Sequence, residues 1–234
     1  MSDRRDELER GLASVQRRIE GACSATGRSP SEVTLVVVTK FFPASDVRLL
    51  HELGVRDVAE NRHQEAVAKR EECSDLDLTW HFVGALQSNK AAAVGGWADV
   101  VQSVDRAKLL PGLSRAASRR GAELDVLLQV SLDPPGTGDG RSGVVPDEAP
   151  ALAEAVRDAE GVRLRGVMGV APLGGDPGEA FALLGRVATA VRAVEPEATW
   201  VSAGMSGDLE AAVEAGATHV RVGSAVLGNR PSRR

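Results

Sequence analysis

Short runs of β-branched residues alternate along this chain with longer amphipathic segments, from residue 33 almost to the end. The runs are nearly continuous in apolar residues, which is typical of strands that are covered on both faces. We predict strands at 33–39, 56–60, 79–83, 98–103, 124–131, 163–169, 199–203 and 219–223. We predict helices between most of them, at 46–53, 63–72, 105–120, 148–160, 178–194 and 207–215.

The first 22 residues have a different pattern. Leu8, Leu12, Val15 and Ile19 follow one another at helical spacing, with charged residues between them. One apolar stripe on a polar rod predicts an amphipathic helix over about 2–22. The stripe is too short for several heptads, so we expect this helix to pack onto the body of its own domain.

Residues that start and stop helices agree with this reading in places. We expect Gly54, Gly121 and Gly216 to end helices. We expect Asp105 and Asp208 to cap the helices that follow them.

About eight strands alternating with helices indicate either a closed parallel (β/α)₈ barrel or an open doubly wound sheet. The strand count and the length of 234 residues favour the TIM barrel. No change in composition divides the chain, so we predict one domain over residues 1–234. The Pro- and Gly-rich stretch 134–146 predicts a mobile loop after the fifth strand. Its G-x-G-x-x-G match at 138–143 is not in the strand–turn–helix context of a dinucleotide site.

Composition excludes several classes of function. The formal net charge is -5 and no long run of Lys or Arg occurs, so a nucleic-acid partner is not expected. No apolar stretch approaches the roughly 20 residues needed to cross a bilayer, and charges occupy the start of the chain. Cys23 and Cys73 are too few for a disulfide framework. We therefore expect a cytoplasmic protein with reduced thiols and no membrane partner.

Residues that carry chemistry gather where the predicted strands end, as they do in enzymes and binding proteins built on such barrels. Lys40 directly follows the first strand. Burial at a barrel mouth favours the neutral amine, which can attack a carbonyl and hold it as an imine. A lysine at a strand end can also simply reach solvent.

Two loops after the last strands suggest what the lysine would meet. Gly204–Gly207 and Gly223–Ser224 each combine glycine with a hydroxyl, and together they predict a phosphate site. An amine opposite a phosphate site indicates a ligand with both an aldehyde and a phosphate. Pyridoxal 5'-phosphate (PLP) and a sugar phosphate both fit. The four histidines show no metal-ligand spacing, so no metal site is expected.

Six segments resemble, in order and spacing, the pyridoxal-phosphate homeostasis protein family. They are VVVTKFFP (36–43), VAENRHQEAVAK (58–69), WHFVGALQSNK (80–90), VQSVD (101–105), LRGVMGV (164–170) and AGMSGDLEAAVEAGATHVRVGSAVLG (203–228). The resemblance spans residues 33 to 228. These proteins resemble the barrel domain of alanine racemase without its second, β-rich domain. The resemblance implies PLP binding and a part in controlling PLP supply, with no established catalytic reaction.

The resemblance also implies roles for individual residues. Lys40 would form the Schiff base with PLP, a lysine aldimine. Ser206 with its neighbour Gly207, and the Gly223–Ser224 pair, would hold the phosphate. Arg221 would lie near the pyridine nitrogen, and Asn61 near the phenolic oxygen or the imine. His81 and Met168 would line the pocket. The implied cofactor-binding set is Lys40, Asn61, His81, Met168, Ser206, Gly207, Arg221, Gly223 and Ser224, with no catalytic residue and no metal.

An arginine at the pyridine nitrogen leaves that nitrogen unprotonated, and the ring is then a weak electron sink. Alanine racemase works with such an arginine by adding a lysine base and a tyrosine base, but this chain has no tyrosine. We therefore predict a carrier or regulator without turnover of its own. PLP-dependent apoenzymes and amino acids are its expected partners. We expect a monomer, because the domain through which the racemases dimerise is absent.

The chain departs from the family pattern at three places. Phe42 stands where many members have a second lysine, and Arg62 replaces an aromatic residue after the Glu-Asn pair. The Lys-Ser-Gly loop of the family reads Arg141–Gly143 here. Three alternatives remain at this stage: a racemase or related PLP enzyme using Lys40 as base, an imine-forming sugar-phosphate lyase, and a structural barrel without a ligand.

Overall fold

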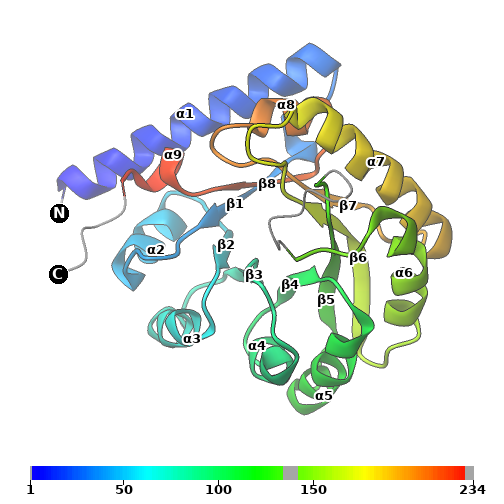
Figure 1. The fold of residues 1–234 in the computed structure, drawn as a ribbon. Coiled ribbons are helices and arrows are strands. Elements are labelled where there is room, and N and C mark those ends of the chain that lie inside the picture. The colour runs from blue at the N-terminus through cyan, green and yellow to red at the C-terminus, as the bar shows by residue number, and fades with distance from the viewer. Residues whose placement is uncertain (1, 134–141, 230–234) are drawn as a thin grey trace.

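A computed structural model describes residues 2–133 and 142–229 (Figure 1). Eight parallel strands close into a barrel in chain order, and β8 pairs with β1 through the register Thr34↔His219 to Val37↔Val222. This confirms the barrel and excludes the open sheet. The strands are β1 Thr34–Val38, β2 Asp57–Glu60, β3 Thr79–Phe82, β4 Val100–Val104, β5 Leu124–Val130, β6 Val162–Gly169, β7 Trp200–Ser202 and β8 His219–Val222.

Helices alternate with the strands around the outside of the barrel (Figure 1). They are α1 Ser2–Thr26, α2 Ala44–Glu52, α3 His63–Glu72, α4 Ala91–Gly95, α5 Leu110–Arg120, α6 Ala149–Arg157, α7 Pro177–Val194, α8 Leu209–Glu214 and α9 Ser224–Leu227. Short 3₁₀ turns occupy Pro30–Glu32, Ser88–Lys90, Ala107–Leu109 and Pro146–Glu148. The apolar spacing did not predict the two shortest helices, α4 and α9.

The predicted helix ends are confirmed, and of the two predicted caps only Asp208 stands at the start of its helix. Gly54, Gly121 and Gly216 follow their helices with φ of 96°, 63° and 94°, a left-handed conformation that glycine adopts without strain. Asp105 lies ahead of a 3₁₀ turn, and α5 begins only after Leu109.

Asp208 is the N-cap residue of α8, but its carboxylate makes no cap hydrogen bond. It instead accepts a hydrogen bond from Met205 N at 2.6 Å. The side chain therefore stabilises the loop before the helix rather than the helix itself.

Helix α1 packs against α8 and α9, across the side of the barrel where the chain closes (Figure 1). Leu8, Val15 and Ile19 of its apolar stripe are buried, which confirms the predicted intramolecular packing. A side chain at Gly11 would place its Cβ 2.4 Å from Val226 O, so glycine is required for this close contact with α9.

The outward faces of the strands and the helices form the main hydrophobic core. The barrel interior is different, since Val100, Leu127 and Met168 form a small separate cluster there. Buried polar side chains on β3, β4, β7 and β8 share that interior. A barrel interior normally holds bulky branched residues, so this polar content indicates a specific role.

Most of the predicted 134–146 loop lies outside the described residues, including most of the G-x-G-x-x-G match. The described end of the loop returns to β5. Ser131 N donates to Val144 O at 2.9 Å, and Val144 N donates to Gln129 O at 2.8 Å. This pairing brings residues 142–144 to the rim of the barrel.

Candidate functional site

A cavity of about 260 Å³ opens at the carboxyl ends of β1, β7 and β8. Because these strands are neighbours in the closed sheet, the loops that follow them meet at one point of the rim. The lining includes Lys40, Ser206, Gly207, Arg221, Gly223 and Ser224. Six of the nine residues that the sequence proposes for the cofactor are therefore brought together.

A tight turn after β1 presents Lys40 to the cavity. Phe42 N donates to Thr39 O at 3.0 Å and closes the turn. Phe41 has a φ of 74°, a left-handed conformation that costs energy for a residue with a bulky side chain. Phe41 N donates to Glu65 Oε1 at 3.2 Å, which helps to hold this conformation. The half-buried Lys40 is thus placed by a strained backbone.

A buried ion pair supports the same turn from outside the barrel. Lys69 of α3 contacts the carboxylate of Glu60 and donates to Thr39 O at 2.9 Å. The hydroxyl of Thr39 donates to Glu60 Oε1 at 2.6 Å. Burial raises the pKa of the Glu60 carboxyl, while Lys69 and Thr39 oppose that shift. The residue immediately before Lys40 is therefore held by both its carbonyl and its side chain.

Hydroxyl and amide groups converge at the other side of the cavity. Ser206 Oγ lies 3.2 Å from Ser224 Oγ and accepts a hydrogen bond from Ala225 N at 3.3 Å. A Cβ at Gly207 would meet nothing within 4 Å, so the space in front of this loop is open. Small polar groups around open space can receive an anion.

Helix α1 contacts both sides of the site, which the sequence did not reveal. Arg18 donates to Ser206 O at 2.9 Å and pairs with Glu210. Arg4 lies over the ring of Phe42, with its guanidinium carbon 5.5 Å from the centroid. These residues looked like solvent-facing charges, because no pattern along the chain links them to loops about 40 and 190 residues away.

Arg221 lies beneath the cavity as a buried cation. It donates to Ser202 Oγ at 2.7 Å and to Gly169 O at 2.9 Å. Burial lowers the pKa of its guanidinium to about 10, and the field of Asp208 opposes the shift. The group remains charged at neutral pH and presents a fixed positive charge to the cavity.

Asn61 follows β2 and lines a second cavity of about 440 Å³ with Gln129 and Ser142. Gly84 makes room for it, because a Cβ there would lie 2.5 Å from Asn61 Oδ1. Gln129 Nε2 donates to Ser142 O at 2.6 Å across this second cavity. The structure thus places Asn61 at the same end of the barrel as Lys40, in a neighbouring cavity.

The structure places two expected pocket residues inside the barrel. In the part of the chain that the structure describes, neither His81 nor Met168 lines the two cavities above. Met168 packs with Val100 and Leu127, and the fully buried His81 bonds other interior side chains. Both lie on strands rather than in the loops beyond them, so their side chains fill the interior below the rim.

Residues 12–231 match the family described as alanine racemase, N-terminal domain. A pyridoxal phosphate homeostasis protein of Mycobacterium tuberculosis is 43% identical over 99% of this chain and 96% of the relative. The Escherichia coli protein of the same name is 34% identical over 96% of this chain and 97% of the relative. The chain belongs to the pyridoxal phosphate homeostasis protein family.

Solved structures agree with this family assignment. PipY of Synechococcus elongatus, solved with PLP bound, is 35% identical and superposes with a TM-score of 0.81 over 94% of this chain and 100% of that chain. Alanine racemase from Corynebacterium glutamicum is 14% identical, with a TM-score of 0.65 over 95% of this chain and 60% of that chain. The second likeness shows the shared barrel.

The described residues contain no group of three or more His, Cys, Asp or Glu side chains placed to hold a metal ion. None of their helices is long and apolar enough to cross a membrane.

Proposed function

We propose that this protein binds PLP, holds it reversibly on Lys40 and contributes to PLP homeostasis without turnover of its own. The observation that carries the proposal is the shared cavity. It combines one lysine, a buried cation and a group of small polar residues at adjacent strand ends. Relatives named pyridoxal phosphate homeostasis protein and the PLP-bound PipY structure support PLP over a sugar phosphate.

The donors in the cavity fit the parts of PLP. Ser206, Gly207 and Ser224 surround open space where a phosphate would accept hydrogen bonds. Arg221 supplies a positive charge that favours an anionic ligand. Bound PLP supplies an aldehyde, with which a primary amine condenses reversibly as water leaves. Lys40 is the one lysine in the lining of this cavity, within the described residues.

Arg221 also favours a carrier over an enzyme. A guanidinium donates hydrogen bonds and accepts none, so it would leave the pyridine nitrogen without a proton. The chain has no tyrosine that could act as a second base. We propose that Asn61 contacts the side of the cofactor nearest to the cavity that Asn61 lines. We propose that His81 and Met168 support the floor of the site from the barrel interior.

The proposal includes a cytoplasmic monomer that exchanges PLP with apoenzymes and amino acids. Cys23 and Cys73 are free, buried thiols, as expected in a reducing compartment. Light scattering of the purified protein tests the monomer, and transfer of PLP to a PLP-dependent apoenzyme tests the exchange.

Borohydride trapping tests the anchor. We expect the purified protein with PLP to show a near-violet absorption band, and borohydride to convert it into a stable pyridoxyl mark on Lys40. The chain has only four lysines, at 40, 69, 90 and 108, so peptide mapping identifies the site without ambiguity. Lys40→Ala should lose the mark and the band, whereas the matched control Lys108→Ala should keep both. A mark on another lysine, or an unchanged band in Lys40→Ala, would refute the assignment.

A racemase or related PLP enzyme using Lys40 as base is the alternative. It predicts exchange of α-deuterium from amino acids at rates far above those with free PLP. We expect no such acceleration for a panel of amino acids that includes alanine.

A further inference from the structure

Arg221 is a buried cation whose hydrogen bonds go to neutral oxygens. It is 5% exposed, and its partners are the hydroxyl of Ser202 and the carbonyl of Gly169. Within the described residues, no carboxylate forms an ion pair with it. Burying a charge without a counter-charge is costly, so the surroundings of Arg221 must compensate in another way.

A chain of side-chain hydrogen bonds leads away from Arg221 through the barrel. Ser202 Oγ, which accepts from Arg221, donates to Gln102 Oε1 at 2.7 Å. Gln102 Nε2 lies 2.9 Å from His81 Nδ1. His81 Nε2 lies 3.0 Å from Asp57 Oδ1, where the chain ends. Because β4 and β7 are not neighbours in the sheet, the bond between Gln102 and Ser202 crosses the barrel interior.

The groups at the two ends of this hydrogen-bonded series determine which atom donates in each bond. A guanidinium can only donate, so Ser202 Oγ accepts a hydrogen bond from Arg221 and donates one to Gln102 Oε1. The amide nitrogen of Gln102 then faces His81, and since it too only donates, His81 Nδ1 must accept. The remaining ring nitrogen, Nε2, carries the proton and donates a hydrogen bond to Asp57. With the Gln102 amide placed so that Oε1 faces Ser202 and Nε2 faces His81, no other arrangement satisfies all four bonds.

We propose that Gln102 and His81 are positioning residues for the end of the PLP site that Arg221 forms, which rests on the proposed function. They tie the guanidinium to Asp57, hold its plane in one orientation and keep His81 as the neutral Nε2–H tautomer. Two of the five N–H groups of Arg221 take part in hydrogen bonds within the described residues. The others remain for a ligand in the cavity that Arg221 lines.

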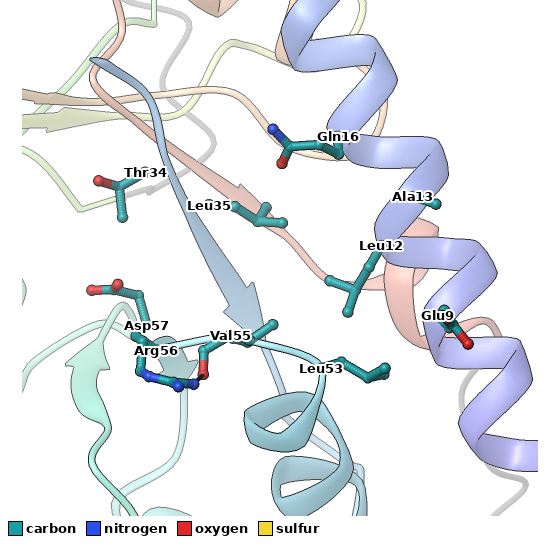
Figure 2. A pocket seen from close by; sticks show the side chains of 11 residues that line it. Glu9, Leu12, Ala13, Gln16, Thr34, Leu35, Leu53, Val55, Arg56 and Asp57 are labelled. Carbon is teal, nitrogen blue, oxygen red and sulfur yellow. Dashed lines mark hydrogen bonds between the residues drawn. The ribbon is translucent and has the colours of Figure 1, made fainter. Parts of the chain in front are cut away.

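Asp57, the carboxylate at the far end of these hydrogen bonds, lies at the opposite end of the barrel from Lys40. It starts β2 and lines a cavity of about 470 Å³ between α1 and the amino end of β1. Figure 2 shows Asp57 on the wall away from α1, beside Thr34 and Arg56. The side chain of Asp57 is 24% exposed, so the negatively charged end of the hydrogen-bonded series reaches solvent. The positive end is buried beneath the Lys40 cavity, where Asp208 acts on it through its field and, within the described residues, no carboxylate contacts it.

Histidine NMR of the PLP-free protein tests the proton arrangement directly. The chain has four histidines, and His81→Asn identifies the signal of His81 among them. Nitrogen-15 shifts at pH 7 should show a neutral ring protonated on Nε2. A ring protonated on Nδ1, or on both nitrogens, would overturn the inference whether or not the protein binds PLP.

Gln102→Glu gives a sharper version of the same test. A carboxylate at this position still accepts from Ser202 but offers an acceptor to His81 Nδ1 instead of a donor. We expect Nδ1 of His81 to carry a proton in this variant, so that it donates to the new carboxylate. Ser103→Ala is the matched control on the same strand, because the buried Ser103 hydroxyl has no hydrogen-bond partner among the described residues. An unchanged His81 signal in Gln102→Glu would show that the two side chains are not coupled.

PLP affinity tests the positioning role. Gln102→Met removes the link while keeping the volume, and the dissociation constant for PLP should rise about tenfold, as for loss of one hydrogen bond to a charged network. Ser103→Ala should bind PLP like the unmodified protein. If Gln102→Met also binds like the unmodified protein, the positioning role is refuted and PLP binding stands. If the unmodified protein itself fails to bind PLP, the proposed function falls, and the histidine tautomer still reports on the chain.

Discussion

Lys69 and Arg221 are both buried cations close to the Lys40 cavity, and they are compensated in opposite ways. Each is 5% exposed. Lys69 contacts the carboxylate of Glu60 directly and also bonds Thr39 O. Arg221 bonds only neutral oxygens within the described residues, and its hydrogen-bonded chain meets a carboxylate at Asp57, beyond three intervening side chains.

The difference separates a supporting charge from a binding charge. A buried cation beside a carboxylate is neutralised locally, and its hydrogen bonds serve to hold the backbone near Lys40. A cation that no carboxylate contacts keeps more of its field at the cavity, where an anionic ligand can use it. We therefore expect changes at Lys69 to act on stability and changes at Arg221 to act on binding.

The largest expected effect is on folding. Lys69→Met leaves the carboxylate of Glu60 buried without a counter-charge and should lower the free energy of unfolding by about 3–5 kcal/mol. Urea unfolding of the PLP-free protein measures this. The double variant Lys69→Met/Glu60→Leu removes both charges and should regain most of the loss. A single variant as stable as the unmodified protein would contradict the ion pair's supporting role.

The second prediction concerns the fall in stability at acid pH, which follows from the buried His219. Burial, with a smaller effect of the nearby cations Arg165 and Arg221, lowers the pKa of His219 to about 4, and Asp57 opposes the shift. The pKa is about 6.5 in an unfolded chain. The unfolded chain therefore binds a proton at His219 more readily than the folded protein does. The stability that depends on a neutral His219 is fully present above pH 6.5. The free energy of unfolding then falls by about 3 kcal/mol in all as the pH drops toward 4.

Unfolding titrations between pH 7 and 4 measure this loss. His219→Gln should flatten this part of the stability curve, because it removes the titrating group. Ser103→Ala, which changes a buried side chain that does not titrate, is the control and should leave the shape of the curve unchanged. Equal slopes for His219→Gln and the unmodified protein would contradict the pKa shift.

Arg221→Met should give the reverse of the Lys69 result. Removing a buried charge that lacks an adjacent carboxylate should change the unfolding free energy by less than about 1 kcal/mol. The dissociation constant for PLP should rise about a hundredfold, since a charged donor is lost from a dry site. Urea unfolding and an absorption titration with PLP measure the two quantities. Strong destabilisation with unchanged affinity would make Arg221 a structural cation like Lys69.

The smallest expected effect concerns α1. Arg18→Ala removes the hydrogen bond to Ser206 O and the half-exposed pair with Glu210. The unfolding free energy should fall by less than about 1 kcal/mol, while PLP affinity falls severalfold because the Ser206 loop loosens. Arg17→Ala changes the exposed neighbour on the same helix and should alter neither the free energy of unfolding nor the PLP affinity. Equal affinities of the two variants would remove Arg18 from the site.

The positions of the strands could be predicted because each is a short apolar run between helical segments. Parallel strands in one barrel end at the same rim, so Lys40, Ser206 and Gly223 were expected to meet, and they line one cavity. Asn61 was expected there too and lies in the neighbouring cavity. These inferences needed only the order of elements and the direction of the strands.

Contacts across the barrel could not be predicted in this way. His81 looked like a pocket residue because it stands near a strand end, but its hydrogen bonds lead to Asp57 and Gln102. Asp208 looked like a helix cap, yet its carboxylate accepts from the loop before it. Which of two nearby partners a polar side chain takes depends on distances that the linear pattern does not contain.

The sequence by itself determined the order of strands and helices, the lysine at the first strand end and the small polar loops after the last strands, and it favoured the barrel, because periodicity, glycine and strand order are local properties. Only the tertiary structure decided that Arg18 supports the Ser206 loop and that Arg221 is connected to Asp57. Those links join residues up to 188 positions apart in sequence. They form because the closed sheet and α1 bring side chains within hydrogen-bonding distance, and burial then makes each unpaired polar group too costly to leave.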